Sequence, residues 1–184
     1  MFRIDQTSLA DVVVAESRVI ADQRGEFSRL FCLDALAPWV GDRQVVQINH
    51  SYTARKGSVR GLHYQLPPAA EMKMVRCLRG RVWDVAVDLR QDSPTFLQWH
   101  AEVLSAQNRR MMVIPEGCAH GFQTLEQESE LVYLHTAQYT PELERGVRYD
   151  DPRLGITWPL VVADISPRDT AHAWLGEEFL GVDI

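Results

Sequence analysis

The stretch that decides the fold runs Lys73-Met74-Val75-Arg76-Cys77-Leu78-Arg79-Gly80-Arg81-Val82-Trp83-Asp84-Val85-Ala86-Val87-Asp88. Its two halves are rich in apolar and β-branched residues and show the two-residue alternation of β-strands. Arg79-Gly80 separates the halves, and a glycine at such a break is typical of a hairpin turn. The stretch therefore predicts two consecutive strands joined by a hairpin.

Similar short runs lie on both sides of this stretch. We expect strands at residues 45–50, 111–114, 130–136 and 146–149. Turn residues such as Asp92-Ser93-Pro94 and Pro115-Glu116-Gly117 separate the runs. Helical signals are limited to Leu33–Val40 and Asp169–Leu180, the second with Asp169 or Thr170 as its cap.

Many short strands at regular spacing are typical of an all-β jelly-roll barrel rather than of a βαβ fold. We predict such a barrel, with a short C-terminal helical segment, as a single domain over residues 1–184. Alternate side chains of a small barrel face inward, so polar residues from several strands converge on one cavity. That cavity is where we expect the functional site.

Composition and charge argue against several classes of protein. Hydrophobic residues make up 46% and charged residues 24% of the chain, an ordinary globular balance. The formal net charge of -6 argues against a nucleic-acid partner, which requires a basic surface. A small anionic ligand remains compatible, because a few arginines in a cleft outweigh the global charge. No run of about 20 apolar residues is present, so no membrane partner is expected.

The three cysteines, Cys32, Cys77 and Cys118, are widely spaced and form no CxxC pair. Neither a disulfide framework nor a zinc knuckle is therefore indicated, and free thiols are typical of a reducing cytosol. Arg3 and Asp5 interrupt any apolar start, so no signal peptide is visible. We expect a cytoplasmic protein.

Two strings carry histidines at a spacing that indicates chemistry. They are Gly57-Ser58-Val59-Arg60-Gly61-Leu62-His63-Tyr64-Gln65 and Pro115-Glu116-Gly117-Cys118-Ala119-His120-Gly121-Phe122. They resemble the two half-motifs of the cupin barrel, G-x5-H-x-H and P-x-G-x-x-H. Gln65 stands where metal-binding cupins have a second histidine, and a glutamine oxygen is a poor transition-metal ligand. We therefore predict a site without metal or cofactor.

Longer strings extend the resemblance from about Ile20 to about Asp169. The segment Arg60-Gly61-Leu62-His63-Tyr64-Gln65 is similar to the signature of the dTDP-4-dehydrorhamnose 3,5-epimerase family, whose members are cupin-type enzymes. The other matching strings are Lys73–Cys77, Trp83–Arg90, Ser93–Phe96, Ile114–Phe122 and Tyr149–Pro152. Several long motifs in the right order are not expected by chance.

The resemblance implies an isomerase that inverts C3, C5 or both in a nucleotide-linked 4-keto-6-deoxyhexose. The best match is conversion of dTDP-4-dehydro-6-deoxy-glucose to dTDP-4-dehydro-rhamnose. The ketone makes the neighbouring hydrogens acidic. The protein then supplies a base, a group that stabilises the enolate oxygen, and an acid on the other face of the ring.

The family's catalytic roles fall on four residues of this chain. His63 matches the base, and histidine suits that role because its pKa lies near the working pH. Asp169 matches the carboxylate that orients the base, and Lys73 matches the cation near the enolate oxygen. Tyr133 matches the proton donor, and Tyr139 is the rival for that role.

The family's substrate-binding positions also have counterparts. Arg24 and Arg60 match residues placed against the diphosphate, which the planar fork of arginine binds through paired hydrogen bonds. Gln47 and Asn49 match contacts to the nucleoside. Further substrate contacts fall on His120, Tyr139, Glu144 and Arg168.

Arg29 departs from the family pattern, because many members carry a glutamate there, at the nucleotide end of the site. The reversed charge leaves undecided whether the nucleotide of the substrate is dTDP, CDP or GDP. The resemblance also implies a homodimer in which Arg24 and Arg29 reach the neighbouring subunit.

Three alternatives remain open. A mono-epimerase would invert only C3 or only C5. A non-catalytic sugar-nucleotide-binding cupin would keep the barrel and the arginines, but it would have no use for the acid–base residues. A metal-dependent cupin isomerase or dioxygenase is disfavoured by Gln65.

Overall fold

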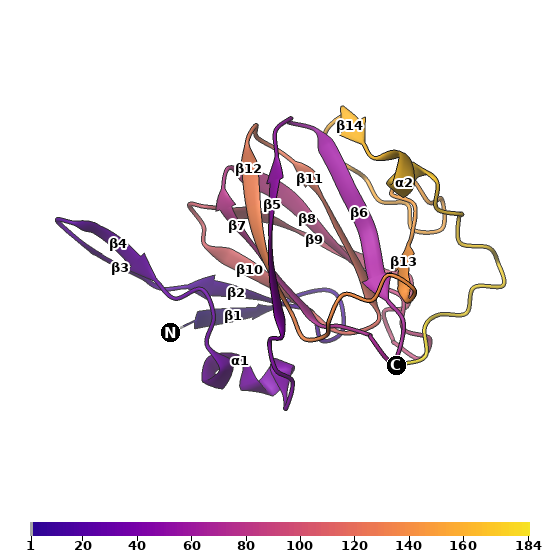
Figure 1. Cartoon of the computed structure of the whole chain (residues 1–184), viewed down its shortest axis with the longest axis horizontal. Coiled ribbons are helices and arrows are strands. Elements are labelled where there is room, and N and C mark those ends of the chain that lie inside the picture. Colours follow the sequence, from indigo (N-terminus) through magenta and orange to yellow (C-terminus); the bar gives the residue numbers. More distant parts are fainter. Residues whose placement is uncertain (1) are drawn as a thin grey trace.

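Two β-sheets packed face to face form the body of the protein in the computed structural model, which describes residues 2–184 (Figure 1). The first sheet has the order β1 (Phe2–Gln6), β2 (Val13–Ser17), β10 (Arg110–Ile114), β7 (Lys73–Arg79), β12 (Ser129–His135) and β5 (Gln47–Thr53). The second has the order β13 (Glu144–Gly146), β6 (Ser58–Gln65), β11 (Cys118–Thr124), β8 (Arg81–Asp88) and β9 (Trp99–Ser105), with β14 (Asp164–Ile165) parallel to β6. This arrangement confirms the prediction of an all-β jelly roll.

The predicted hairpin between β7 and β8 is wrong, because the two strands lie in different sheets. Gly80 turns the chain from one sheet into the other with a φ of +73°. A Cβ at this position would lie 2.6 Å from Oγ of Ser129. Both the backbone conformation and the lack of space therefore require glycine at this corner.

Apolar side chains form one layer between the sheets and one on each outer face. Val75 of β7 and Val82 of β8 both belong to the inner layer. The C-terminal segment covers the outer face of the second sheet through residues such as Leu154 and Val182. Consecutive strands thus bury their apolar faces across the barrel, and this burial outweighs pairing within one sheet.

Helix α1 (Leu33–Val40) covers the outer face of the first sheet and has the predicted bounds. Leu36 and Val40, four residues apart, are its buried positions. Gly41 ends the helix with a φ of +59°, and its amide donates to the carbonyl of Ala37. Within residues 2–184, no helix has both the length and the apolar character needed to cross a membrane.

The predicted helix at Asp169–Leu180 is much shorter, since α2 covers only Pro167–Thr170. Its cap is Ser166, whose Oγ accepts from the amide of Asp169, rather than Asp169 or Thr170. Beyond α2 the backbone binds the body of the protein. The Leu175 amide, for example, donates to Oδ2 of Asp151 at 2.6 Å. Tertiary hydrogen bonds of this kind replace the backbone hydrogen bonds expected within a longer helix.

The strands predicted at residues 45–50, 111–114 and 130–136 are present with shifted ends. The strand predicted at 146–149 is displaced, because β13 ends at Gly146, where it pairs with His63 of β6. Pairing with the end of β6, rather than the local apolar run, sets the position of this strand.

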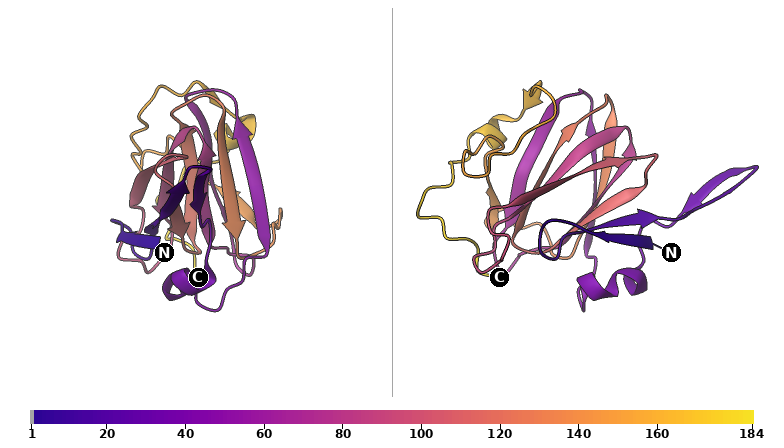
Figure 2. Two further views of the ribbon diagram at one scale, coloured as in Figure 1. Left: turned by 90° about the vertical axis from the view of Figure 1, so that its left-hand side faces the viewer. Right: turned by 180° about the vertical axis from the view of Figure 1, so that it is seen from behind.

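A two-stranded hairpin, β3 (Val19–Asp22) and β4 (Gly25–Ser28), projects from the body (Figure 2). Its cross-strand partners Ile20 and Phe27 are 64% and 66% exposed. A lone ribbon of this kind is not stable by itself. An exposed apolar pair on a projecting hairpin is typical of a surface that contacts another chain.

Candidate active site

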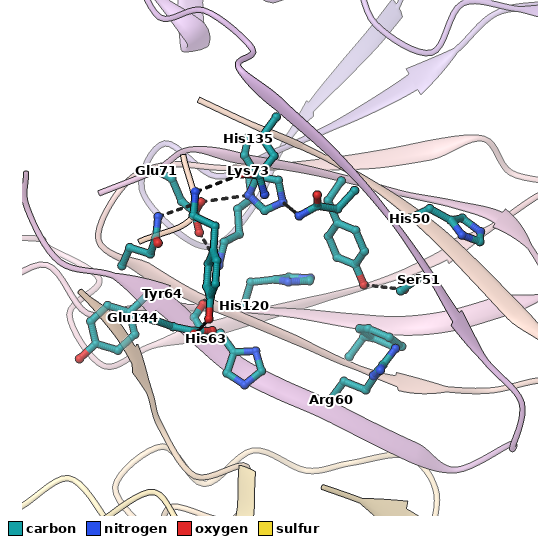
Figure 3. A pocket seen from close by; sticks show the side chains of 16 residues that line it. His50, Ser51, Arg60, His63, Tyr64, Glu71, Lys73, His120, His135 and Glu144 are labelled. Atoms are coloured by element: carbon teal, nitrogen blue, oxygen red, sulfur yellow. Dashed lines mark hydrogen bonds and ion pairs between the residues drawn. The ribbon is translucent and has the colours of Figure 1, made fainter. Parts of the chain in front are cut away.

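A cavity of about 350 Å³ opens between the two sheets (Figure 3). Nine predicted site residues line it, namely Gln47, Asn49, Arg60, His63, Lys73, His120, Tyr133, Tyr139 and Glu144. Seven further residues complete its wall, namely His50, Ser51, Tyr64, Gln65, Glu71, Phe122 and His135. Polar side chains from both sheets thus converge here, as the predicted barrel requires.

A β-bulge brings Arg60 and His63 into the same cavity. The two lie three residues apart on β6, so regular alternation would point them to opposite faces. Opposite them on β11, His120 pairs with His63 and Phe122 with Arg60, only two residues apart. Gly61 accommodates the extra residue with a φ of +109°, and a Cβ there would lie 2.6 Å from the His120 carbonyl oxygen.

His63 and Asp169 form a hydrogen-bonded pair at one wall. Nε2 of His63 lies 2.7 Å from Oδ1 of Asp169, and the Gly61 amide donates to the other carboxylate oxygen at 3.3 Å. Burial opposes ionisation, but the hydrogen bond and charge of His63, together with the hydrogen bonds from Gly61 and Ser166, hold the pKa of Asp169 below its ordinary value. The ionised carboxylate only accepts, so Nε2 carries the ring proton and Nδ1 the lone pair.

Tyr133 stands on the opposite sheet, on β12. Its hydroxyl lies 3.0 Å from Oγ of Ser51, and its ring packs edge-on to His120 at 6.0 Å between centroids. Burial raises the pKa of the Tyr133 phenol, and the hydrogen bond to Ser51 offsets only part of this. The phenol is therefore protonated at neutral pH.

Lys73 reaches across the end of the cavity from β7. Its ammonium donates to the carbonyl oxygen of His63 at 2.9 Å and pairs with Oε1 of Glu71 at 3.1 Å. The other oxygen of Glu71 lies 3.0 Å from Nδ1 of His135. Burial opposes ionisation of Glu71, but hydrogen bonding to His135 and the charge of Lys73 hold its pKa below the ordinary value. An ammonium has three donors, so one remains for a ligand oxygen.

A second histidine–carboxylate pair lies at the back of the cavity. Nε2 of His120 lies 2.8 Å from Oδ1 of Asp84, and the Asp84 side chain is fully buried. Burial raises the pKa of Asp84, although the neighbouring His120 opposes this. The pair fixes the His120 ring so that its other nitrogen can face a ligand.

Four predicted binding residues form one cluster at the cavity mouth. The Tyr139 hydroxyl donates to Oε2 of Glu144 at 2.7 Å, and Arg168 pairs with the same oxygen. The Tyr139 amide donates to Oε1 of Gln47 at 3.0 Å. Burial opposes ionisation of Glu144, but the hydrogen bonds from Tyr139 and Arg168 lower its pKa. Tyr139 itself is 51% exposed.

The side chain of Gln65 is hydrogen-bonded to the surrounding backbone. Its Oε1 accepts from the Thr140 amide at 2.6 Å, and its Nε2 donates to the carbonyl oxygens of Ala69 and Gln138. The oxygen that would have to replace an imidazole is thus already bonded. In residues 2–184, a different trio, His63, Asp169 and His172, brings metal-ligating atoms together.

Arg24 and Arg29 lie on or beside the projecting hairpin and do not line the cavity of their own chain. Arg24 is exposed and pairs with Asp22, while Arg29 contacts Sγ of Cys32 at 3.5 Å. A role for either residue in the site therefore requires a second copy of the chain.

Ser51, Asp84, Glu71 and His135 were not predicted as site residues. Strand periodicity carries a signal for two of them. Ser51 follows Asn49 by two residues on β5, and His135 follows Tyr133 by two residues on β12. Asp84 stands out as a charge within an apolar run. Glu71 lies outside the strands, and no sequence pattern indicated it.

The fold and the cavity define a jelly-roll protein whose pocket holds a histidine–carboxylate pair, a buried phenol and a lysine, a set suited to proton transfer next to a carbonyl. A family model described as dTDP-4-dehydrorhamnose 3,5-epimerase matches residues 6–177. The chain belongs to this family. The predicted class, a carbohydrate epimerase and hence an isomerase, is thereby confirmed.

Individual relatives agree with this assignment. The dTDP-4-dehydrorhamnose 3,5-epimerase of Shigella flexneri is 42% identical over 97% of this chain and 96% of its own length. A crystal structure of the 3,5-epimerase of Legionella pneumophila with dTDP-4-keto-L-rhamnose is 38% identical, with a TM-score of 0.92 over 100% of this chain and 99% of that one. The dTDP-4-dehydrorhamnose 3-epimerase of Streptomyces niveus is 40% identical over 85% of this chain and 76% of its own.

Proposed function

We propose that the protein inverts both C3 and C5 of dTDP-4-dehydro-6-deoxy-glucose and so forms dTDP-4-dehydro-rhamnose. The observation that carries the proposal is the placement of His63, which is paired with Asp169, and of Tyr133 on opposite sheets that face one cavity. Inversion at carbon requires a base on one face of the sugar and an acid on the other. The Legionella structure, which holds the proposed product, supports the choice of sugar nucleotide.

Each inversion begins at His63. The lone pair on Nδ1 takes the hydrogen from the carbon next to the C4 ketone, and the electron pair of that C–H bond moves into the carbonyl to form an enolate. The ionised Asp169 stabilises the imidazolium that results, because it accepts the proton on Nε2. The free donor of the Lys73 ammonium stabilises the enolate oxygen.

The inversion ends at Tyr133. Its phenol gives a proton to the opposite face of the same carbon, and the enolate electrons form the new C–H bond. Tyr133 is left as a phenolate, and His63 is left protonated. The imidazolium releases its proton to solvent and the phenolate regains one, so the net reaction changes only the configuration. The ketone is itself the electron sink, and no cofactor or metal takes part in these steps.

Binding residues occupy the rest of the cavity wall. Arg60 is exposed, and among residues 2–184 its guanidinium makes only one long contact, of 3.4 Å to Thr53, so it is available to bind the diphosphate. Gln47, Asn49 and Tyr139 lie together at the mouth, where they would contact the nucleoside. The cysteines are unpaired, which supports a cytoplasmic enzyme.

A homodimer completes the site in this proposal. Arg24 and Arg29 lie outside the cavity of their own chain, and the exposed pair Ile20 and Phe27 gives the hairpin an apolar surface for a second copy. Sedimentation velocity at micromolar concentration should give the mass of a dimer. Phe27→Asp should shift the protein towards monomer, whereas Leu180→Asp, at an equally exposed apolar residue of the C-terminal segment, should not. A wild-type monomer would refute the dimer.

Proton NMR in deuterated water tests the reaction itself. With dTDP-4-dehydro-6-deoxy-glucose, the signals at C3 and C5 should both disappear as deuterium enters, and the rhamno configuration should accumulate. CDP- and GDP-linked analogues should react far more slowly. Exchange at C3 alone would establish a mono-epimerase, the activity that the Streptomyces niveus relative is named for. No exchange with any keto-sugar nucleotide would leave a binding protein and overturn the proposal.

A further inference from the structure

Three metal-ligating side chains meet beside the catalytic pair. His63, Asp169 and His172 each offer one ligand atom, and these atoms lie within 4.8 Å of one another. Imidazole and carboxylate are common ligands of Zn²⁺. The His172 ring lies edge-on to His63 at 6.1 Å between centroids. His172 has no part in the proposed reaction, and the cupin half-motifs do not include it.

The His172 ring fills the space next to Gly146 on the second sheet. Gly146 pairs directly with His63 across β13 and β6. A Cβ on Gly146 would lie 2.0 Å from Nε2 of His172, so the imidazole fills the space that any side chain at residue 146 would take. This nitrogen is buried and has no hydrogen-bond partner among residues 2–184. A buried polar atom of this kind calls for an explanation.

We propose that His63, Asp169 and His172 form a binding site for a transition-metal cation such as Zn²⁺, and that the bound cation inhibits the enzyme. The binding stands on the geometry of the three side chains. The inhibition rests on the proposed function, in which His63 is the base. Whichever ring nitrogen of His63 holds the cation, the other carries the proton, so no lone pair remains for the substrate.

The cluster needs only a small adjustment to bind a cation. Zinc bonds of about 2.0–2.1 Å place tetrahedral ligand atoms roughly 3.3 Å apart, so the widest pair must close by about 1.5 Å at most. Asp169 is held by α2, while His172 lies just beyond that helix, after Ala171. The His63 side chain is 30% exposed, so water can take a fourth position.

Zinc binding is tested by calorimetry on tag-free protein freed of metal, with Zn²⁺ alone as the probe. The wild type should bind one Zn²⁺ per chain. His172→Ala should weaken the dissociation constant at least tenfold, and Gly146→Ala should do the same because its Cβ displaces the ring. His100→Ala is the matched control. Nε2 of His100 is also buried and has no partner within the described part of the chain, but His100 lies on β9, outside the trio. Equal affinity in the wild type and His172→Ala would overturn the site.

Turnover in the presence of Zn²⁺ separates the site from the proposed mechanism. Zn²⁺ should inhibit the wild type, a chelator should restore activity, and His172→Ala should keep its turnover and resist Zn²⁺ at the same concentration. The assays of the wild type and of His172→Ala contain the same substrate, so binding of zinc to its diphosphate lowers the free zinc concentration equally in both. Binding that depends on His172 but does not slow turnover would overturn the inhibition and count against His63 as the base, while the site itself would stand.

Discussion

His63→Asn is expected to lower kcat by roughly two to four orders of magnitude, the usual contribution of a general base. Asparagine keeps a polar side chain near Asp169 but has no basic nitrogen to accept a proton from carbon. The affinity for the sugar nucleotide should change little, since we assign the diphosphate to Arg60 and not to His63. Deuterium exchange followed by NMR measures the rate, and calorimetry with the product measures the affinity.

Arg60→Ala is the matched contrast, because both residues lie on β6 and line the same cavity. The loss of the guanidinium should mainly raise the dissociation constant and leave most of kcat. The loss of kcat in Asp169→Asn should be closer to the loss in His63→Asn than to that in Arg60→Ala. The reason is that an amide cannot stabilise the imidazolium as a carboxylate does. If His63→Asn damaged affinity and rate equally, His63 would be a binding residue and the base would have to be another group.

Tyr133→Phe is expected to uncouple exchange from inversion. The change removes the hydroxyl that bonds to Ser51 but keeps the ring that packs against His120. His63 can still form the enolate and return a solvent-derived proton to the same face. Deuterium should therefore continue to enter the sugar, while the rate of net inversion falls by roughly two orders of magnitude or more. The ratio of exchange to inversion in one NMR time course measures the effect.

Tyr139→Phe provides the comparison with the rival donor. Tyr139 is 51% exposed at the cavity mouth and donates to Glu144, whereas burial keeps the Tyr133 phenol protonated inside the cavity. Tyr139→Phe should therefore alter mainly the affinity for the nucleotide. Inversion at the wild-type rate in Tyr133→Phe, together with a loss in Tyr139→Phe, would reverse the assignment.

Most of the strands and most of the residues that line the cavity could be predicted from the sequence. Apolar alternation is a local property, and it located β7, β8 and helix α1 at or close to their observed bounds. The family motifs supplied His63 and Tyr133, because short strings carry residue identity in order. The combination of a barrel with a histidine, a lysine and a tyrosine could therefore be predicted from the sequence alone.

Strand partners were decided only by the tertiary structure. The run around Arg79-Gly80 has the local pattern of a hairpin, yet β7 and β8 lie in opposite sheets. Local pattern fixes the conformation of a segment, while the choice of partner depends on which arrangement buries both apolar faces. The short α2 has the same cause, because the tail after Thr170 bonds to the body of the protein instead of to itself.

The geometry of the site was also decided by the tertiary structure. Alternation on β6 would separate Arg60 from His63, and only the bulge at Gly61 brings them into one cavity. Asp84 behind His120, and His172 in the space beside Gly146, likewise come from distant parts of the chain. The sequence by itself determined which chemical groups the protein carries, whereas long-range packing determined which of them meet, because the distances between them depend on contacts among residues far apart along the chain.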